Sequence, residues 1–382
     1  MSDITKPIIL DETGQRIAIA LEEIAKGTDT VIYGVSRNTT DTSSAWRRIG
    51  ASIGLHANAT HDGTDVENDF DNCYPWSGIK TVNMNDNGEV IAEYGDANFA
   101  FDGTNGEVMT YIPEFYWKRD VNDAGTETIQ ISEYHFKGST HSRAFYIARY
   151  TTSANTHSIS GVASLVDQTI STFRTQARAK GTGWGLLDYH IFILQMLYLV
   201  EYADYNSQAT LGLGHSDGSN TAQIDCGGCD TLGMKSGCLA NDGKHAMIYR
   251  GVENIFGNIW QFVDGLGIKD NVGYISYNPT DYANETYIAP YSQVGYTNAT
   301  SNGNPKILGY DVNNPMIMLP TTLGGGSTTG TCDYYWQNTG NRVSFFGGAW
   351  LVGSFDGLFY WSLNSDWSYA DASIGSRLLL TI

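Results

Sequence analysis

Four residues in one loop-rich stretch have the types and spacing that a metal site requires. Cys226 and Cys229 form a C-x-x-C pair, and Cys238 and His245 follow. Three thiolates and an imidazole are a ligand set for tetrahedral zinc. Structural zinc sites usually show tighter pairing than one C-x-x-C with loosely spaced companions. We therefore expect free or locally packed thiols, no metal site and no cofactor, and zinc stays open as the alternative.

Other catalytic constellations do not emerge from the sequence. A hydrolase triad cannot be assembled, and neither a P-loop nor a dinucleotide-binding fingerprint occurs. Carboxylates are plentiful, but nothing in their spacing selects the two that a glycosidase would need. We expect no enzyme activity.

The end of the chain has an unusual composition. Residues 342–382, the closing segment, read RVSFFGGAWLVGSFDGLFYWSLNSDWSYADASIGSRLLLTI and contain no Lys, Glu, Gln, Met or Pro. Lys, Glu and Gln are the residues that surfaces usually expose. Aromatic side chains alternate here with Gly, Ser, Asn and Asp, which is the mixture that binding loops use. The composition indicates a segment that contacts a partner.

Bulk properties narrow the choice of partner. The 382 residues carry a formal net charge of −19, which argues against nucleic acid and against anionic membrane surfaces. The longest apolar run, 191–200, contains Gln195 and is too short to span a bilayer, and no signal peptide is visible. We expect no membrane insertion and synthesis in a cytosol. The high Gly and Tyr content is typical of a β-rich, loop-rich protein.

The elements that would position these residues can be placed from turns and periodicity. Residues 11–27 predict a short helix that packs on its own chain or serves attachment or self-association. The stretch 28–140 predicts strands, with hairpins at Asn87-Gly88 and at residues 122–125. The carboxylates of DFDNCYPWSG are expected to cap backbone groups. Helices are predicted over 169–179 and from Asp188 to Ala203, the second buried against a sheet.

Several motifs resemble one protein family. The segment 257–264, GNIWQFVD, resembles the G-N-V-W-E-W motif of the formylglycine-generating-enzyme branch of the C-type lectin fold. Residues 250–254, RGVEN, resemble an element found beside it in phage tail proteins, as do LQMLYLVEYADYNSQ, DFDNCYPWSG and YIPEFYWKR. GGAWLVGSFDGLF and IGSRLL resemble the variable region of proteins diversified by retroelements, such as phage tropism determinants. The resemblance covers most of the chain.

This family implies a test on the closing segment. Diversity-generating retroelements mutate adenines, chiefly in Asn codons, and such changes cannot give Trp, Lys, Glu, Gln or Met. Trp350, Trp361 and Trp367 are therefore expected to be fixed scaffold. The glycines at 347, 348, 353, 357 and 375 are expected to frame the loops, with Ile374 and Leu378 in the core. The candidate variable, ligand-binding residues are Ala349, Leu351, Val352, Phe355, Asp356, Tyr360, Ser362, Ser368, Tyr369, Asp371 and Ser373.

Two features of the related proteins are missing. The formylglycine-generating reaction uses a late cysteine pair, whereas no Cys follows Cys332 here. Sugar-binding C-type lectins carry E-P-N or Q-P-D motifs, and neither occurs, so calcium-dependent sugar binding is not implied.

The resemblance implies an α+β protein in three parts. These are an N-terminal helix (1–27) for attachment or oligomerisation, a β-rich domain (28–140), and a C-type lectin-like domain (141–382) with the variable region at about 342–382. It implies a homotrimeric receptor-binding protein on a phage or prophage tail tip, or on a bacterial surface, that binds a host-cell protein or glycan through solvent-facing residues. The alternatives are a formylglycine-generating-type or glycan-acting enzyme and a purely structural tail protein.

Overall fold

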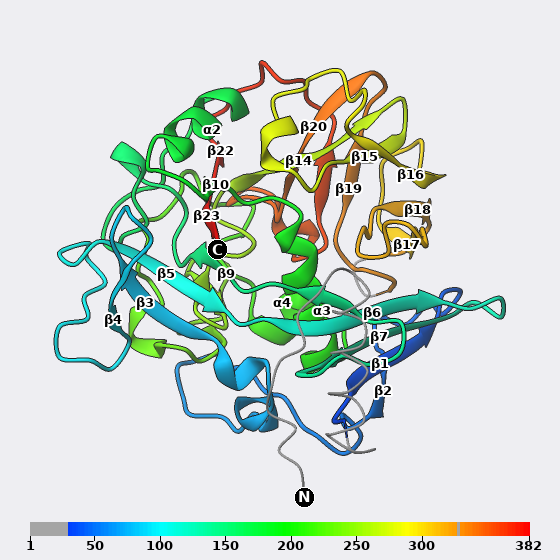
Figure 1. Ribbon diagram of the computed structural model, residues 1–382, viewed down its shortest axis with the longest axis horizontal. Helices are drawn as coiled ribbons and strands as arrows, with labels where there is room; N and C mark the ends of the chain where they lie inside the picture. The colour runs from blue at the N-terminus through cyan, green and yellow to red at the C-terminus, as the bar shows by residue number, and fades with distance from the viewer. Residues whose placement is uncertain (1–29, 327–328) are drawn as a thin grey trace, which may run out of the picture.

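A computed structural model describes residues 30–326 and 329–382 (Figure 1). The helix expected over residues 11–27 lies outside this range. The described chain is α+β, as predicted, and its sheets are mostly antiparallel. Its α-helices are α2 (Ile170–Arg178), α3 (His190–Tyr202) and α4 (Ser207–Leu211). Short 3-10 turns are η1 (Asp69–Asn72), η2 (Trp76–Gly78), η3 (Ala154–Thr156), η4 (Asp230–Leu232), η5 (Pro279–Asp281) and η6 (Gly353–Phe355).

The N-terminal sheet has the strand order β2-β1-β7-β6-β8 and is antiparallel throughout. Its strands are β1 (Tyr33–Asn38), β2 (Arg47–Gly50), β6 (Phe115–Val121), β7 (Thr126–Ser132) and β8 (Thr140–Ser142). The predicted turn at residues 122–125 joins β6 to β7: the Asn122 side chain accepts bonds from the amides of Ala124 and Thr126. That hairpin prediction is confirmed.

A second sheet joins distant parts of the chain in the order β10-β23-β9-β5-β3-β4. Its strands are β3 (Lys80–Met84), β4 (Val90–Glu93), β5 (Glu107–Ile112), β9 (Phe145–Ala148), β10 (Trp184–Leu186) and β23 (Leu378–Thr381). The predicted Asn87-Gly88 hairpin joins β3 to β4. Strands from both sides of residue 140 share this sheet, so the expected domain boundary there is not a boundary between sheets.

The C-terminal sheet carries most of the closing segment. Its order is β16-β15-β14-β20-β21-β19, and β22 pairs with β14; the β14–β22 and β19–β21 pairs are parallel. The strands are β14 (Trp260–Lys269), β15 (Val272–Ile275), β16 (Ser292–Thr297), β19 (Tyr335–Gln337), β20 (Asn341–Phe346), β21 (Trp361–Leu363) and β22 (Ile374–Gly375). Two small sheets complete the fold: β11 (Gly237–Cys238), β12 (Met247–Tyr249) and β13 (Val252–Glu253), and the pair β17 (Pro305–Leu308) and β18 (Pro320–Leu323).

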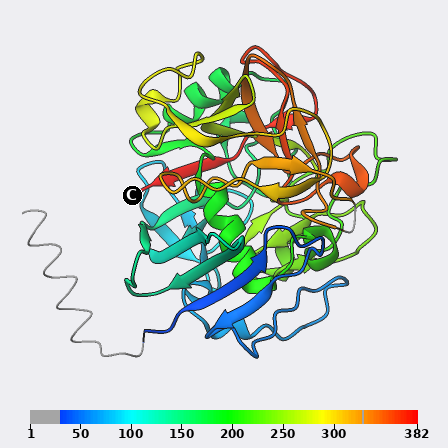
Figure 2. The same ribbon diagram turned by 90° about the vertical axis from the view of Figure 1, so that its right-hand side faces the viewer.

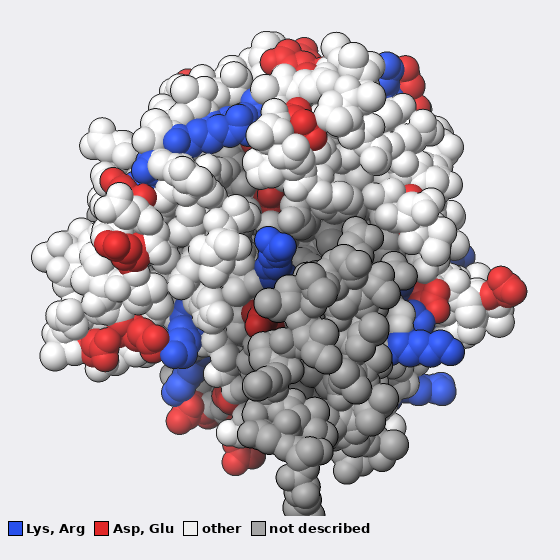
Figure 3. All heavy atoms as spheres, viewed as in Figure 1, with Lys and Arg blue, Asp and Glu red and all other residues white. Residues whose placement is uncertain are grey.

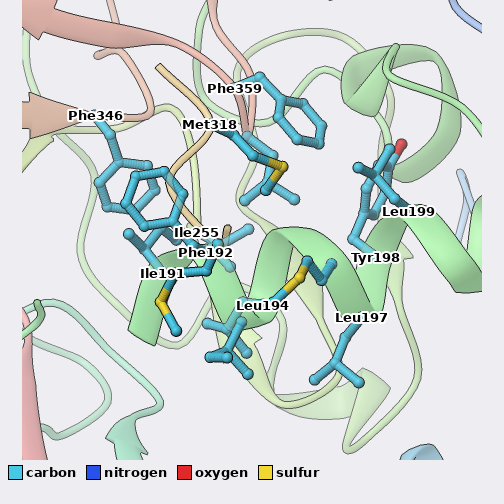
Figure 4. Close-up of a cluster of buried hydrophobic side chains, with 14 of the residues drawn as sticks. Ile191, Phe192, Leu194, Leu197, Tyr198, Leu199, Ile255, Met318, Phe346 and Phe359 are labelled. Atoms are coloured by element: carbon cyan, nitrogen blue, oxygen red, sulfur yellow. The ribbon is translucent and has the colours of Figure 1, made fainter. Parts of the chain in front are cut away.

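Helix α3 lies at the centre of the molecule, between the N-terminal sheet and the closing segment (Figure 1). Every residue of α3 is buried, which confirms the predicted core helix. Side chains from β20 and from two loops pack against it, including Phe346 of β20, Phe359 between η6 and β21, and Met318 before β18 (Figure 4). Gln195, the polar residue of the run, donates to the carbonyl of Leu358 at 2.7 Å. The helix therefore both forms the core and holds the closing segment.

The two predicted helices begin and end close to the expected residues. Thr169 caps α2, and its hydroxyl accepts from the Thr172 amide. The Asp188 carboxylate accepts from the His190 amide at the start of α3, and the helix ends at Ala203 in the left-handed conformation. Within residues 30–326 and 329–382, no helix is both long and apolar enough to cross a bilayer.

A buried arginine, Arg377, connects the second sheet to the C-terminal sheet. Arg377, between β22 and β23, is fully buried and uses all five of its N–H donors. It donates to the side-chain oxygen of Gln261 and to the backbone carbonyls of Ala148, Arg149, Glu253 and Asn254, at 2.7–3.0 Å. Burial lowers the pKa of Arg377 to about 10, so the guanidinium stays charged at neutral pH.

We predict that Arg377→Lys destabilises the protein by about 2–5 kcal/mol, because an ammonium has three donors and leaves at least two buried acceptors unpaired. Chemical unfolding checks this. Arg143→Lys is the matched control, since Arg143 is exposed, and should change stability little. An equal, small effect of both substitutions would contradict the central role of Arg377.

Candidate functional site

The closing segment runs back and forth across the C-terminal sheet before it joins the second sheet. It forms β20, turns at Gly347 and Gly348, passes through η6, and returns as β21 and β22 before β23 ends the chain (Figure 2). Gly348 is required where the chain turns: its φ is +82°, and a Cβ there would lie 1.5 Å from an oxygen of Asp356. The loops between these strands carry most of the candidate ligand-binding residues.

The three tryptophans expected as scaffold are held by packing. Trp350 and Trp361 are buried, and Trp361 stacks on Phe192 of α3 with the ring centroids 5.1 Å apart. Trp367 is half-buried, with the guanidinium of Arg174 5.3 Å from its ring centre. Ile374 and Leu378 lie in the core, as expected. The frame of the closing segment is thus packed against the body of the protein.

Six of the eleven candidate residues reach solvent in the described chain. Leu351, Phe355 and Tyr369 are 52%, 41% and 41% exposed, which is high for large apolar side chains. Ser368 is exposed, and Val352 and Asp371 are half-buried. All six lie in the loop that contains η6 or in the loop between β21 and β22.

Three candidates do not face solvent, which corrects the expectation for them. Ala349, Asp356 and Tyr360 are buried. The Tyr360 ring packs edge-on against Trp260, with the centroids 4.5 Å apart. Tyr360 directly precedes β21, an interior strand between β20 and β19 that is buried along its whole length. Tyr360 therefore enters the sheet from its interior side and packs into the core.

The remaining two candidates, Ser362 and Ser373, are buried but line a hollow of about 160 Å³ that opens beside Tyr369. Aromatic rings form part of its wall and small polar side chains the rest. Its lining residues are Trp260, Trp336, Phe345, Ser362, Asn364, Ser365, Tyr369, Ser373 and Ile374. This hollow can take a ring or a small side chain of a partner, because its lining offers both apolar contact and hydrogen-bonding groups.

Tyr334 and Trp336 extend the surface, and they were missed because they precede the closing segment. Trp336 on β19 is 41% exposed. Tyr334 bridges the hollow to the η6 loop, with its ring 5.5 Å from Trp336 and 4.8 Å from Phe355. We name the whole surface the aromatic face; it comprises Tyr334, Trp336, Leu351, Val352, Phe355, Ser368, Tyr369 and the residues that line the hollow.

The polar loop of this face is internally hydrogen-bonded. Asp366 accepts from the amide and hydroxyl of Ser368, and Asp371 accepts from the amide and hydroxyl of Ser373. The bonds from Ser368 hold the pKa of Asp366 below its ordinary value. These turns fix the loop that carries Tyr369 and so lower the conformational entropy that binding would cost.

The cysteines are buried, and the carboxylates that were predicted to cap backbone groups form hydrogen bonds or ion pairs. Among the described residues, no three His, Cys, Asp or Glu side chains lie close enough to share a metal ion. Cys226, Cys229 and Cys238 are buried, burial raises their pKa above the ordinary thiol value, and His245 pairs with Asp242 instead. In the DFDNCYPWSG loop, Asp69 accepts from the His56 amide as expected, whereas Asp71 pairs with Arg250.

A serine motif that the sequence analysis did not recognise also lies in this region. Residues 214–218, GHSDG, have the G-x-S-x-G pattern. A nucleophile elbow needs an exposed Ser between a strand and a helix. Ser216 follows α4 instead, is buried, and donates its hydroxyl to the carbonyl of Leu213. The pattern here is structural.

A larger cavity, about 380 Å³, lies beside α2 and β10 and contains two buried carboxylates, Asp188 and Asp264. Arg174 binds both oxygens of Asp264 at 2.8 and 2.7 Å. Asp188 accepts from the Tyr282 hydroxyl at 2.8 Å and pairs with His190. Both carboxylates are engaged by neighbouring side chains.

We predict that Tyr360→Ala costs about 3–5 kcal/mol of stability, as truncation of a buried aromatic does. Phe355→Ala and Tyr369→Ala should each cost less than about 1 kcal/mol, because about two-fifths of each side chain is in water. Differential scanning calorimetry of the three variants checks the predicted order of their losses in stability. Equal melting temperatures for all three would contradict the assignment of Tyr360 to the core.

Comparison with known proteins gives matches to solved structures only. No protein-family model and no curated protein matches the chain. The chain is similar to "Major Tropism Determinant U1 Variant" at 13% identity and a TM-score of 0.32, over 90% of this chain and 82% of that chain. It is similar to the M1 variant at 13% identity and a TM-score of 0.34, over 92% and 82%. PvdO from Pseudomonas aeruginosa matches at 10% identity and a TM-score of 0.28, over 75% and 99%.

At these identities and TM-scores, the likeness carries no conclusion about the ligand or activity of this chain. Four of the solved structures to which the chain is similar are variants of a major tropism determinant.

Proposed function

We propose that the chain is a receptor-binding protein that contacts its partner through the aromatic face. The observation that carries this proposal is the composition and placement of that face. Exposed aromatic and aliphatic side chains stand on hydrogen-bonded loops, beside a hollow lined by aromatic and small polar residues, over buried tryptophans. Rigid aromatic residues supply contact area at low entropic cost, and Ser, Asn and Asp supply adaptable hydrogen bonds.

The proposed mechanism is non-covalent recognition. Phe355 and Tyr369 bury area against the partner, and a partner group enters the hollow beside Trp336. The frame beneath is held independently: Gln195 and Ser207 bind both backbone groups of Leu358, and Arg377 holds the end of the segment. Substitutions on the face therefore change the partner without loss of the fold.

The proposal extends to diversification and assembly. The accessible positions and the two hollow serines are the proposed variable residues, with the tryptophans and Arg377 fixed. We further propose a homotrimer, whose avidity raises weak single-site affinity, on a phage or prophage tail tip or on a bacterial surface. The partner is a host-cell surface protein or glycan.

On the face shown in Figure 3, charged side chains are scattered over the visible described surface without a continuous basic patch, in keeping with a partner other than nucleic acid.

An enzymatic role has less support. The thiols of the described chain are buried, and the carboxylates of the larger cavity are engaged in ion pairs and hydrogen bonds. A role as a purely structural tail protein would require that other copies of the chain cover the aromatic face. The binding experiment below distinguishes such a covered face from one that is exposed to a partner.

We predict that the 3′ coding segment varies among sister isolates at the codons for Leu351, Val352, Phe355, Ser368 and Tyr369. The changes should fall at adenines of a near-copy template beside a reverse transcriptase gene. Trp350, Trp361 and Arg377 should not vary. Sequencing of the locus decides this, and a locus without reverse transcriptase or template would refute diversification.

We also predict that a Phe355→Ser/Tyr369→Ser variant binds candidate host cells at least tenfold more weakly, about 1.4 kcal/mol, because two central aromatic contacts are lost. Flow cytometry with labelled protein measures it. The control is Ile53→Ser/Val312→Ser, which removes two apolar side chains that are 70% and 74% exposed elsewhere. Equal binding of the two variants would contradict the proposed face. A reduced oligomer mass of the first variant in light scattering would instead favour the structural role.

A further inference from the structure

The hollow of the aromatic face has four aromatic rings in its lining. Trp336 and Tyr369 are exposed, whereas Trp260 and Phe345 are buried. Phe345 is nearly parallel to Tyr369, at an interplanar angle of 11° with the centroids 6.5 Å apart, and nearly perpendicular to Trp260, at 77° and 5.3 Å. The face of an aromatic ring carries negative partial charge and attracts cations. The aromatic part of the lining therefore favours a positively charged group.

The small polar residues of the lining have more acceptors than donors left over. The hydroxyls of Ser362 and Ser365 both donate to the side-chain oxygen of Asn364 at 3.0 Å, and the Ser373 hydroxyl donates to Asp371 at 2.6 Å. A hydroxyl has one proton and two lone pairs, so these three serines retain only lone pairs for a ligand. In this set, the Asn364 amide is the one group whose protons no described residue accepts. The polar part of the lining thus suits a ligand that donates hydrogen bonds.

The charges beside the hollow are mainly negative. Its lining residues include no Lys, Arg or His of the described chain. Asp366 and Asp371 flank Tyr369 in the loop between β21 and β22. Arg342, whose charge acts on Asp366, donates its Nε–H to the Thr339 carbonyl at 2.6 Å. The chain as a whole has a net charge of −19. This field attracts a cation to the hollow and repels an anion.

A lysine side chain matches all three properties of the hollow. Its ammonium donates hydrogen bonds and accepts none, and its apolar stem packs on aromatic rings while the charge is attracted to their faces. A cavity of about 150 Å³ holds one benzene ring, so the hollow of about 160 Å³ has room for one such side chain. A quaternary ammonium group has no proton to donate and would leave the serine oxygens without a partner. A carboxylate would face those lone pairs directly.

We propose that the hollow binds a lysine side chain of a protein partner, with the lysine stem against Trp336 and Tyr369 and the ammonium against Ser362, Ser365 and Ser373. The inference rests on the proposed function of the aromatic face, and it names the partner as a protein with an exposed lysine instead of a glycan. Because two of these serines are among the proposed variable residues, the preference for lysine belongs to this variant of the face.

The first test titrates the full-length protein with two small probes and follows binding by NMR. One probe is Nα-acetyl-lysine amide, and the other is Nα-acetyl-2-aminoheptanoic acid amide, in which a methyl group replaces the ammonium. The lysine probe should bind at least about fivefold more tightly, since it alone makes cation–π contacts and charged hydrogen bonds. Added salt should reduce this preference. Equal binding of the two probes, or no saturable binding of the lysine probe, would overturn the inference.

The second test separates the charge of the ligand from its shape. Trp336→Leu removes an aromatic ring but keeps apolar bulk, and it should weaken binding of the lysine probe at least about fivefold. Trp336→Tyr keeps an aromatic face and should bind more tightly than Trp336→Leu. The matched control is Tyr94→Leu, which removes an aromatic ring that is 45% exposed beside β4, and it should bind as the unchanged protein does. Equal losses in Trp336→Leu and Trp336→Tyr would contradict recognition of the ammonium.

A third test on host cells distinguishes this inference from the proposed function. Acetylation of surface lysines removes their charge, whereas reductive methylation keeps it. Acetylated cells should bind the protein at least about tenfold more weakly than methylated cells, as for loss of a central contact. Binding that survives acetylation but is lost in Phe355→Ser/Tyr369→Ser would refute the lysine and leave the proposed function standing. Cells that bind neither protein would count against the proposed function, and the probe titration would then decide the inference alone.

Discussion

The guanidinium of Arg377 is the interaction on which the arrangement of this molecule depends. It is buried where the second sheet meets the C-terminal sheet, and its five donors bind acceptors from β9, from the segment 253–254 and from β14. A planar group with fixed donors tolerates only one placement of these acceptors. No carboxylate of the described residues forms an ion pair with this charge, and the carbonyl dipoles and Gln261 stabilise it. The end of the chain thereby determines how the sheets join.

The closing segment is held at its ends and at its middle. β20 pairs with β14 at the start, Leu358 is bound by Gln195 and Ser207, and β22 and β23 complete the two larger sheets at the end. Only the stretches between these points reach solvent. This division separates the part of the segment that maintains the fold from the part that is free to contact a partner.

Much of the fold was predictable from local patterns. Asn87-Gly88 and the turn at Asn122 specify hairpins because few residues adopt the backbone angles that tight turns need. Thr169 and Asp188 mark helix starts because their side chains satisfy amides that the helix leaves free. The continuous apolar run of α3 predicted full burial for the same reason that any all-round apolar helix does. The tryptophans of the closing segment were identified as frame by what adenine mutation cannot produce.

Sequence by itself indicated the helices α2 and α3, the two hairpins, the α+β class and the stretch of the chain that carries most of the candidate binding surface, whereas the strands between residues 260 and 337 were not predicted. Tertiary structure decided which side chains of that stretch face solvent. Tyr360 and Tyr369 are chemically identical and nine residues apart in sequence, yet one packs on Trp260 and the other is exposed. The difference arises because β21 lies between two other strands, and strand order depends on pairings between distant segments. The contribution of Trp336 to the face depends on the same β19–β21 pairing, which no local pattern encodes.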